Sequence, residues 1–336
     1  MDDTIMKRYF LLLRSNFPQV VMKPTLQFLS HTAFLIVVFA VTVTGQVPRV
    51  PPVEEIIAKA VVQRGRYIDE FKDLLSRETK TFRIFDKSGS VRSSREIVST
   101  FIVYQSPANG RIGEFRNVIS VDGRPVENAD RRAEEFFTEI AAGSNSAREW
   151  ERIKKEGTRF DDPLFINGLT LFQAVVLADN IRPSFRFAVS GTEDLDGRGV
   201  YVVTYDQTRD TQYISMDPKQ MANDGKPELV FDIDLPDNAV ARVTGKFWID
   251  RETFQVRKEE RRVSIQNGAG STPVIAVETQ LDYHNSPFAI LTPKRIVFTQ
   301  FRRPKGRQPA RKETEILFNY DNFTKPDVEV KGAVKN

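Results

Sequence analysis

The chain contains no cysteine, and its 336 residues include only two histidines and two tryptophans. Without cysteine there is no disulfide, no thiol nucleophile and no thiolate metal site. One histidine, His31, lies in an apolar N-terminal region, so a Ser-His-Asp triad would have to use His284. A metal site made of histidines is excluded for the same reason. His284 lies in the run Tyr283–Pro287, which predicts a strand end entering a turn and a structural or exposed histidine.

Motifs for nucleotide binding or nucleophilic catalysis are also missing, because no G-x-S-x-G, Walker A or G-x-G-x-x-G pattern occurs. The acidic stretch Met216–Asn238 could offer carboxylates to calcium, but it lacks the ligand spacing of an EF-hand loop. We expect a solvated loop and an edge strand there. We therefore predict no catalytic residue, no cofactor and no metal. A hydrolase centred on His284 is the enzymatic alternative.

Positive and negative charges are nearly balanced, since the formal net charge is only +4, and we predict no nucleic-acid partner. A local exception is Lys294–Lys312, which has eight basic residues and no acidic one. Its prolines and glycine place much of it in a hairpin loop. This loop is either a solvated tip that discourages edge pairing or a contact for an anionic membrane surface or an acidic partner. The residues predicted to make such a contact are Arg302, Arg303, Lys305 and Arg307.

The N-terminal region contains an apolar run of eleven residues, Ala33–Val43. A membrane-spanning helix needs roughly 20 apolar residues, whereas the apolar part of a secretory signal peptide needs about 7–15. We therefore predict that residues 1–45 form a cleavable signal peptide, with Met22 as an alternative start of translation. An uncleaved anchor is the other interpretation. Cleavage would make the protein periplasmic or secreted.

Beyond a proline-containing linker at residues 46–52, helical and extended patterns alternate. Apolar residues at helical spacing predict a helix over Val53–Arg77, and alternating residues then predict three strands that end at Val121. Residues 127–180 form a predicted helical insertion, which includes a very apolar piece at Asn167–Ala178. From there to the C-terminus the patterns predict only strands, and their spacing favours sequential antiparallel pairing. The result is an α+β fold, with a single domain over residues 53–325 and a flexible tail at 326–336.

The chain is organised around the stretch Ala241–Ile265. Apolar residues alternate with polar ones from Val243 to Ile249, the period-2 pattern of a strand with one apolar face. The polar run Arg251–Thr253 allows a reversal, and an extended pattern with a charged middle resumes at Phe254. We therefore predict a long hairpin at the centre of a wide antiparallel sheet.

Three short motifs support a family resemblance. The run Gly245–Asp250, with Thr253 and Arg257 after it, resembles the central hairpin of periplasmic lipoprotein carriers of the LolA/LolB-like superfamily. Leu291–Ile296 is similar to a later strand of that family, and Glu315–Phe323 is similar to its closing strand. The resemblance implies a curved antiparallel sheet that forms an incomplete barrel, with helices packed on or across its concave side.

A concave apolar sheet would suit an exported carrier, because each buried methylene of an acyl chain contributes about 0.8 kcal/mol. We therefore predict a non-enzymatic binding protein for a lipid, an acyl chain or a lipoprotein. The side chains predicted to line the concavity are Phe185, Phe187, Val189, Val202, Phe247, Ile249, Val277 and Leu281. These residues could equally form a closed core. The alternative function is an envelope sensor or scaffold that uses the same fold to bind a protein partner.

Overall fold

The structure, a computed structural model, describes residues 50–72, 74–105, 112–141, 146–161, 169–217, 229–268, 270–302, 310–321 and 323–325. These residues belong to one compact unit that begins at Val50. The predicted signal peptide, residues 46–49 of the predicted linker and the predicted tail lie outside the described residues. Within the described ranges, no helix is both long enough and apolar enough to cross a membrane.

Helix α1 (Val53–Glu70) opens this unit, and two glutamates in its first turn suit the positive end of the helix dipole. The prediction of a helix as far as Arg77 is wrong, because strand β1 (Leu75–Phe85) begins before that residue. From Ser76 to Phe82 every second residue of β1 is buried, and three of these four residues are polar. A polar inner face has no apolar alternation, which is why the sequence pattern did not detect the first half of this strand.

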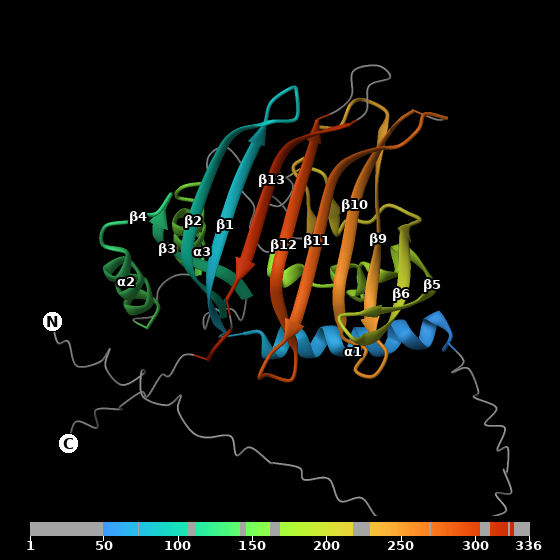
Figure 1. The fold of residues 1–336 in the computed structure, drawn as a ribbon, viewed down its shortest axis with the longest axis horizontal. Helices are drawn as coiled ribbons and strands as arrows, with labels where there is room; N and C mark the ends of the chain where they lie inside the picture. Colours follow the sequence, from blue (N-terminus) through green and yellow to red (C-terminus); the bar gives the residue numbers. More distant parts are fainter. Residues whose placement is uncertain are drawn as a thin grey trace, which may run out of the picture. The chain divides into compact units, whose positions relative to one another are not determined.

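Eleven strands form one sheet in the order β4-β3-β2-β1-β13-β12-β11-β10-β9-β6-β5 (Figure 1). Neighbouring strands are antiparallel. The edge strands β4 and β5 do not pair with each other in the described structure, so the sheet is open. Besides β1, its strands are β2 (Val91–Gln105), β3 (Ile112–Val121), β4 (Arg124–Pro125), β5 (Phe185–Leu195), β6 (Arg198–Gln207), β9 (Ala239–Asp250), β10 (Val256–Asn267), β11 (Val274–Asn285), β12 (Leu291–Arg302) and β13 (Arg311–Tyr320).

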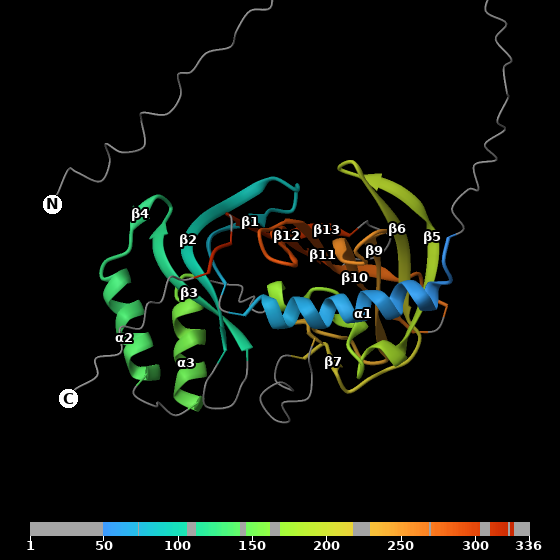
Figure 2. The same cartoon turned by 90° about the horizontal axis from the view of Figure 1, so that it is seen from below.

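Seen from below, the sheet curves into an arch, and α1 runs across the mouth of the arch at one end of the strands (Figure 2). This arrangement confirms the predicted fold class, an α+β protein with a curved, incompletely closed antiparallel sheet and helices on its concave side. The central hairpin is confirmed as β9 and β10, which pair along most of their length.

The insertion between β4 and β5 contains two helices, α2 (Ala129–Ala141) and α3 (Ser146–Gly157). They pack on β3, where the rings of Phe115 and Phe136 stack with centroids 4.3 Å apart. In place of the predicted helical piece at Asn167–Ala178, the described residues contain two short 3-10 helices, η2 (Leu169–Phe172) and η3 (Val175–Leu177). A third, η4 (Arg182–Ser184), follows them.

The edge strand expected within Met216–Asn238 is mostly irregular over the described residues 229–233. Only β8 (Leu229–Val230) is a strand, and it pairs in parallel with β7 (Ile214–Ser215) outside the main sheet. The main hydrophobic core lies between the concave face of the sheet, α1 and the 3-10 helices, and it consists of two clusters, one near β5–β10 and one near β1–β2 and β11–β13.

Candidate functional site

The side chains predicted to line the concavity are covered by protein. Phe247 and Ile249 are completely inaccessible to solvent and pack with apolar residues of α1 and η3 in one cluster. The same cluster contains Phe185 and Val277, with Phe187 and Val189 packed against it, whereas Leu281 belongs to the second cluster. The structure thus places five of these residues in a closed core and the partly buried Phe187 and Val189 at its edge, and binding of a ligand there stays a prediction.

Val202 lies on the other face of the sheet, which corrects the prediction for this residue. It pairs across β6 and β9 with Trp248, whereas its neighbour Val203 pairs with Phe247. Successive side chains of a strand point to opposite faces, so Val202 lies on the face opposite Val203, which belongs to the main core. Val202 and Trp248 form a small separate cluster, and the Trp248 indole donates a hydrogen bond to Glu193 (2.8 Å).

Residues 169–184, which we call the covering segment, close the concave face together with α1. The segment has short 3-10 turns in place of a regular helix, and its apolar residues from Ala174 to Leu177 are at most 1% exposed. Ala174 has a left-handed backbone (φ 45°), which is unfavourable for a residue with a Cβ atom. The segment therefore depends on partners outside itself for its conformation.

One set of partners comes from β3 and α1 and meets the segment at Thr170. The Glu114 carboxylate accepts hydrogen bonds from the Thr170 backbone N–H (2.8 Å) and from its hydroxyl (2.5 Å). The hydroxyl of Tyr67 on α1 donates to the Thr170 carbonyl oxygen (2.9 Å). Since all three residues are buried, these bonds satisfy backbone groups that could not reach water.

A second set of partners comes from β10, in the charged middle of the central hairpin. The Glu259 carboxylate accepts a hydrogen bond from the Ala174 backbone N–H (3.0 Å), and Arg261 Nη2 donates to the Phe172 carbonyl oxygen (2.8 Å). Arg261 also donates to Glu259 through Nε and Nη2 (2.9 and 2.7 Å). Burial would lower the pKa of Arg261, but the Glu259 carboxylate raises it, so the buried guanidinium stays charged.

Tyr205 completes this second set, because its hydroxyl donates to Glu259 (2.8 Å). Its ring crosses β9 at Gly245, where an added Cβ atom would lie 2.4 Å from the ring and 2.2 Å from the Glu260 carbonyl oxygen. Glycine is therefore needed in the Gly245–Asp250 motif so that Tyr205 can reach the buried carboxylate. Burial and then the Glu259 charge raise the pKa of Tyr205 well above its ordinary value.

A larger buried ionic group lies under the β1–β3 side of the sheet. Arg116 donates to both oxygens of Glu78 (2.7 and 2.8 Å) and forms an ion pair with Glu114 (2.8 Å). Lys80 forms an ion pair with Asp161, which follows α3. All of these side chains are at most 2% exposed. Burial raises the pKa of Asp161 in spite of its Lys80 partner.

Little empty space remains beneath α1. A void of about 10 Å³ borders Tyr67, Ala174, Val256 and Leu291, which is at most enough for one water molecule. An acyl chain does not fit there unless residues move. In this closed state the concave face is occupied by the protein's own apolar segment.

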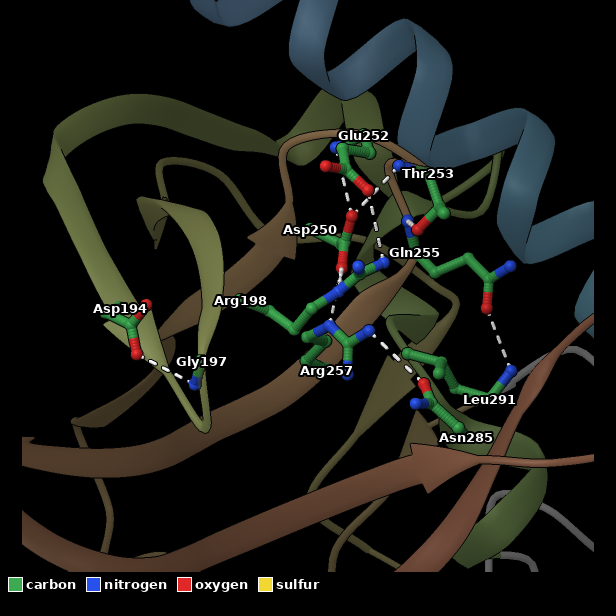
Figure 3. Close-up of polar contacts among 10 residues, drawn as sticks. All are labelled: Asp194, Gly197, Arg198, Asp250, Glu252, Thr253, Gln255, Arg257, Asn285 and Leu291. Atoms are coloured by element: carbon green, nitrogen blue, oxygen red, sulfur yellow. Dashed lines mark hydrogen bonds and ion pairs between the residues drawn. The ribbon is translucent and has the colours of Figure 1, made fainter. Parts of the chain in front are cut away.

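The turn between β9 and β10 is fixed by Asp250, the last residue of the motif (Figure 3). One carboxylate oxygen accepts hydrogen bonds from the Glu252 and Thr253 backbone N–H groups (both 3.0 Å), and the other accepts one from Arg257 Nε (2.6 Å). Burial alone would raise the pKa of Asp250, but the Thr253 N–H and the Arg257 guanidinium lower it to about 2. Arg198 also lies 3.4 Å from this carboxylate, so Asp250 joins β6, β9 and β10 at one corner.

The other predicted site residues play no part in these contacts. Arg302 pairs with Glu313 at the exposed end of β12 (2.9 Å), whereas Arg303, Lys305 and Arg307 lie outside the described residues. His284 is partly buried at the end of β11, and burial together with the Lys294 charge lowers its pKa. No group of three or more potential metal ligands occurs among the described residues.

Sequence reasoning missed the buried polar residues Glu114, Arg116, Glu259 and Arg261. For the last two a signal exists, since Glu259 and Arg261 alternate in phase with Val263 and Ile265, and all four are buried. Extending the period-2 pattern backward through the charged run would have placed both residues on the inner face. For Glu114 and Arg116 the sequence offers no comparable signal, because β3 is buried along most of its length on both faces.

Comparisons with known proteins identify the fold only distantly. No protein-family model and no curated protein matches the chain. Among solved structures, a DUF1329 family protein from Desulfovibrio piger matches with 11% identity and a TM-score of 0.34, over 84% of this chain and 95% of its own. A putative outer membrane lipoprotein-sorting protein domain from Vibrio parahaemolyticus matches with 10% identity and a TM-score of 0.31, over 83% and 96%.

A LolA superfamily protein from Nitrosomonas europaea also matches, with 10% identity and a TM-score of 0.27 over 83% of this chain and 96% of its own. At these TM-scores the likeness carries no argument about activity. The solved structures similar to this chain include members of the family that its sequence motifs resemble.

Proposed function

We propose that this chain is an exported, periplasmic binding protein that carries a lipid, an acyl chain or a lipoprotein on the concave face of its sheet, without catalysis. In this proposal the covering segment moves aside and the apolar chain of the ligand takes its place against Phe247 and Ile249. The observation that supports it is the way the segment is held, by side chains of the sheet and of α1 that bond to its backbone.

The energies involved make such an exchange feasible. A hydrogen bond to a charged group contributes about 1.5–3 kcal/mol, so the few bonds at Thr170, Phe172 and Ala174 hold the segment without locking it. An entering acyl chain contributes about 0.8 kcal/mol for each methylene that it buries. The strained backbone of Ala174 further reduces the free energy by which the closed state is preferred.

Export rests on the predicted signal peptide at residues 1–45. Sequencing the N-terminus of protein from an envelope fraction should give a chain that begins near Gln46. A mature chain that retains Ala33–Val43 would instead indicate an anchored protein and would contradict a freely diffusing carrier.

The binding proposal is tested by loosening the covering segment. Thr170→Val removes the hydroxyl that donates to Glu114, so we expect a loss of about 1.5–3 kcal/mol in the free energy of unfolding. Because the free energy that the closed state loses is gained by a ligand of the open state, the affinity for a fluorescently labelled fatty acid should rise by about tenfold to a hundredfold. Urea unfolding and fluorescence titration measure the two effects.

The matched control is Thr292→Val. Thr292 is completely buried in β12, and its hydroxyl has no hydrogen-bond partner in the described structure. We expect this variant to be at least as stable as the wild type, with unchanged affinity. If Thr170→Val lowers stability but leaves the affinity unchanged, the covering segment is simply part of a permanent core and the proposal fails.

A protein partner for a sensor or scaffold is the second candidate function. It is favoured by an acidic cleft at the start of β9, at the end of the strand that lies away from the Asp250 corner.

A further inference from the structure

A second hollow lies at the start of β9, at the end of this strand away from the Asp250 corner. It is a cleft of about 710 Å³. Apolar residues of the cleft belong to the hydrophobic core or pack against it: Ile214, Met216, Ile233, Leu235 and Ala241. The cleft also has four aspartates, Asp210, Asp217, Asp232 and Asp234, and one cation, Arg242. It therefore combines an apolar floor with an acidic rim.

One wall of the cleft is an extended segment, residues 231–235. Its side chains alternate, since Phe231 and Ile233 are buried whereas Asp232 and Asp234 are exposed. The Phe231 and Ile233 backbone N–H groups donate to carbonyl oxygens of Ser215 and Met216 (2.9 and 3.0 Å). These two bonds follow directly after the parallel pair β7–β8, so the Phe231 and Ile233 N–H groups on the inner side of the segment are satisfied.

The other edge of this segment is open. Successive residues of an extended chain direct their N–H and C=O groups to opposite sides, so those of Asp232 and Asp234 point away from β7. Neither residue makes a backbone hydrogen bond within the described structure. An open edge of this kind accepts an additional strand from another chain.

The charges on the rim select the kind of strand. Arg242 donates to Asp210 (2.6 Å), so the one cation among the described residues that line the cleft is already paired. Asp232 and Asp234 form no ion pair within the described ranges. Two residues apart in an extended chain, their carboxylates lie on one side at a spacing of about 6.6 Å. Basic residues two positions apart in a neighbouring strand have the same spacing.

We infer that the acidic cleft binds an extended peptide of a partner protein in which basic and apolar residues alternate. The peptide lies along residues 232–235 and bonds to their free backbone groups. Its basic side chains face Asp232 and Asp234, and its apolar side chains point to the floor formed by Ile233 and its neighbours. This ligand and this site differ from those of the concave face, and the inference does not depend on lipid binding.

The test uses a labelled peptide, acetyl-Lys-Val-Lys-Val-Lys-amide, and fluorescence anisotropy at low salt with the whole protein. We expect saturable binding that weakens as salt is added. The variant Asp232→Asn with Asp234→Asn should lower the affinity about threefold to tenfold, as expected for two exposed charge pairs. The matched control is Glu54→Gln with Glu70→Gln, which removes the same charge from exposed positions of α1 and should leave the affinity unchanged.

Two further peptides separate alternation and main-chain pairing from simple charge attraction, and they need no variant. A peptide with the same composition in the order Lys-Lys-Lys-Val-Val should bind more weakly. A peptide N-methylated at alternate residues should lose most of its binding, because it cannot donate to the open edge. Equal binding of all three peptides, or unchanged affinity of the aspartate variant, would overturn the inference and leave only non-specific attraction of cations.

Discussion

Two buried arginines lie on the concave face, and they are paired in different ways. Arg116 pairs with carboxylates of the sheet, through two bonds to Glu78 and an ion pair to Glu114. Arg261 pairs with one carboxylate, Glu259, and also donates to the Phe172 carbonyl oxygen of the covering segment. Arg116 therefore ties strands to each other, whereas Arg261 ties the sheet to a segment that could leave it.

This difference shows that burial alone does not define the role of a charged residue. The ion pairs of Arg116 with Glu78 and Glu114 would remain if the covering segment moved, although Glu114 would lose its bonds to Thr170. Around Arg261, two bonds would be lost together: Glu259 would lose the hydrogen bond from the Ala174 N–H, and Arg261 would lose its acceptor, the Phe172 carbonyl oxygen. The five changes below are ordered from the largest expected effect to the smallest.

Arg116→Met should cause the largest loss. It leaves Glu78 and Glu114 buried without their cation, and breaking a buried ion pair from one side costs about 3–5 kcal/mol. Urea unfolding measures this loss. As the control, Arg83→Met removes a half-exposed partner of Glu315 and should cost less than about 1 kcal/mol. A similar cost for both variants would show that the Arg116 pairs contribute no more than a surface pair.

Arg261→Met tests whether the second arginine acts on the covering segment. We expect a loss of about 3 kcal/mol from the unpaired Glu259 and a selective increase in hydrogen exchange at the Ala174 amide. In Arg116→Met, exchange at Ala174 and in β13 should increase together, because the whole fold is destabilised. Equal patterns in the two variants would remove the distinction between the two arginines.

Gly245→Ala should displace Tyr205 and thereby weaken its hydrogen bond to Glu259, the carboxylate that pairs with Arg261. The new methyl group would lie 2.4 Å from the tyrosine ring, and the ring must move away from Glu259, at a cost of about 1–3 kcal/mol. Thermal unfolding measures this cost. Gly65→Ala is the opposite case, since no atom lies within 4 Å of the added Cβ atom and a helical alanine should stabilise α1 by about 0.5–1 kcal/mol. A Gly245→Ala variant of wild-type stability would mean that the tyrosine contact is dispensable.

Asp250→Asn probes the far end of the same hairpin and should show its effect through pH. The carboxylate pKa falls from 3.8 to about 2 on folding. This contributes roughly 2 kcal/mol of stability. A depressed pKa stabilises the fold above about pH 4, and the contribution is lost as the pH falls through about 2. Unfolding free energies measured from pH 7 to pH 2 should therefore decline less in Asp250→Asn than in the wild type, and parallel curves would contradict the assignment.

His284→Ala should have the smallest effect, within about 0.5 kcal/mol. The side chain is only partly buried, and burial and Lys294 together disfavour its charged form. Lipid and peptide binding should also be unchanged, because His284 lies neither on the covering segment nor in the acidic cleft. Loss of a measured activity in a folded His284→Ala protein would revive the hydrolase hypothesis.

The sequence predicts the parts of the fold in which each residue obeys one simple pattern. The alternation in Gly245–Asp250 predicts β9 with its apolar face, and the helical spacing from Ile56 to Tyr67 predicts α1. The pattern fails at β1, where Glu78 and Lys80 are inward, because a buried salt bridge replaces apolar contact there. It also fails at the covering segment, whose 3-10 turns depend on partners 56 to 103 positions away.

The order of the strands has a consequence for how the chain folds as it is synthesised. Strand β1 pairs on one side with β2 and on the other with β13, so that Glu78 lies opposite Tyr320. The hairpins from β9 to β12 can form as each strand leaves the ribosome, but β1–β4 cannot join them until the last strand of the sheet has emerged. Contacts of such long sequence separation slow folding. Until then β1 and β12 each have an unpaired edge, and a chain truncated before Arg311 would be two unjoined half-sheets prone to aggregation.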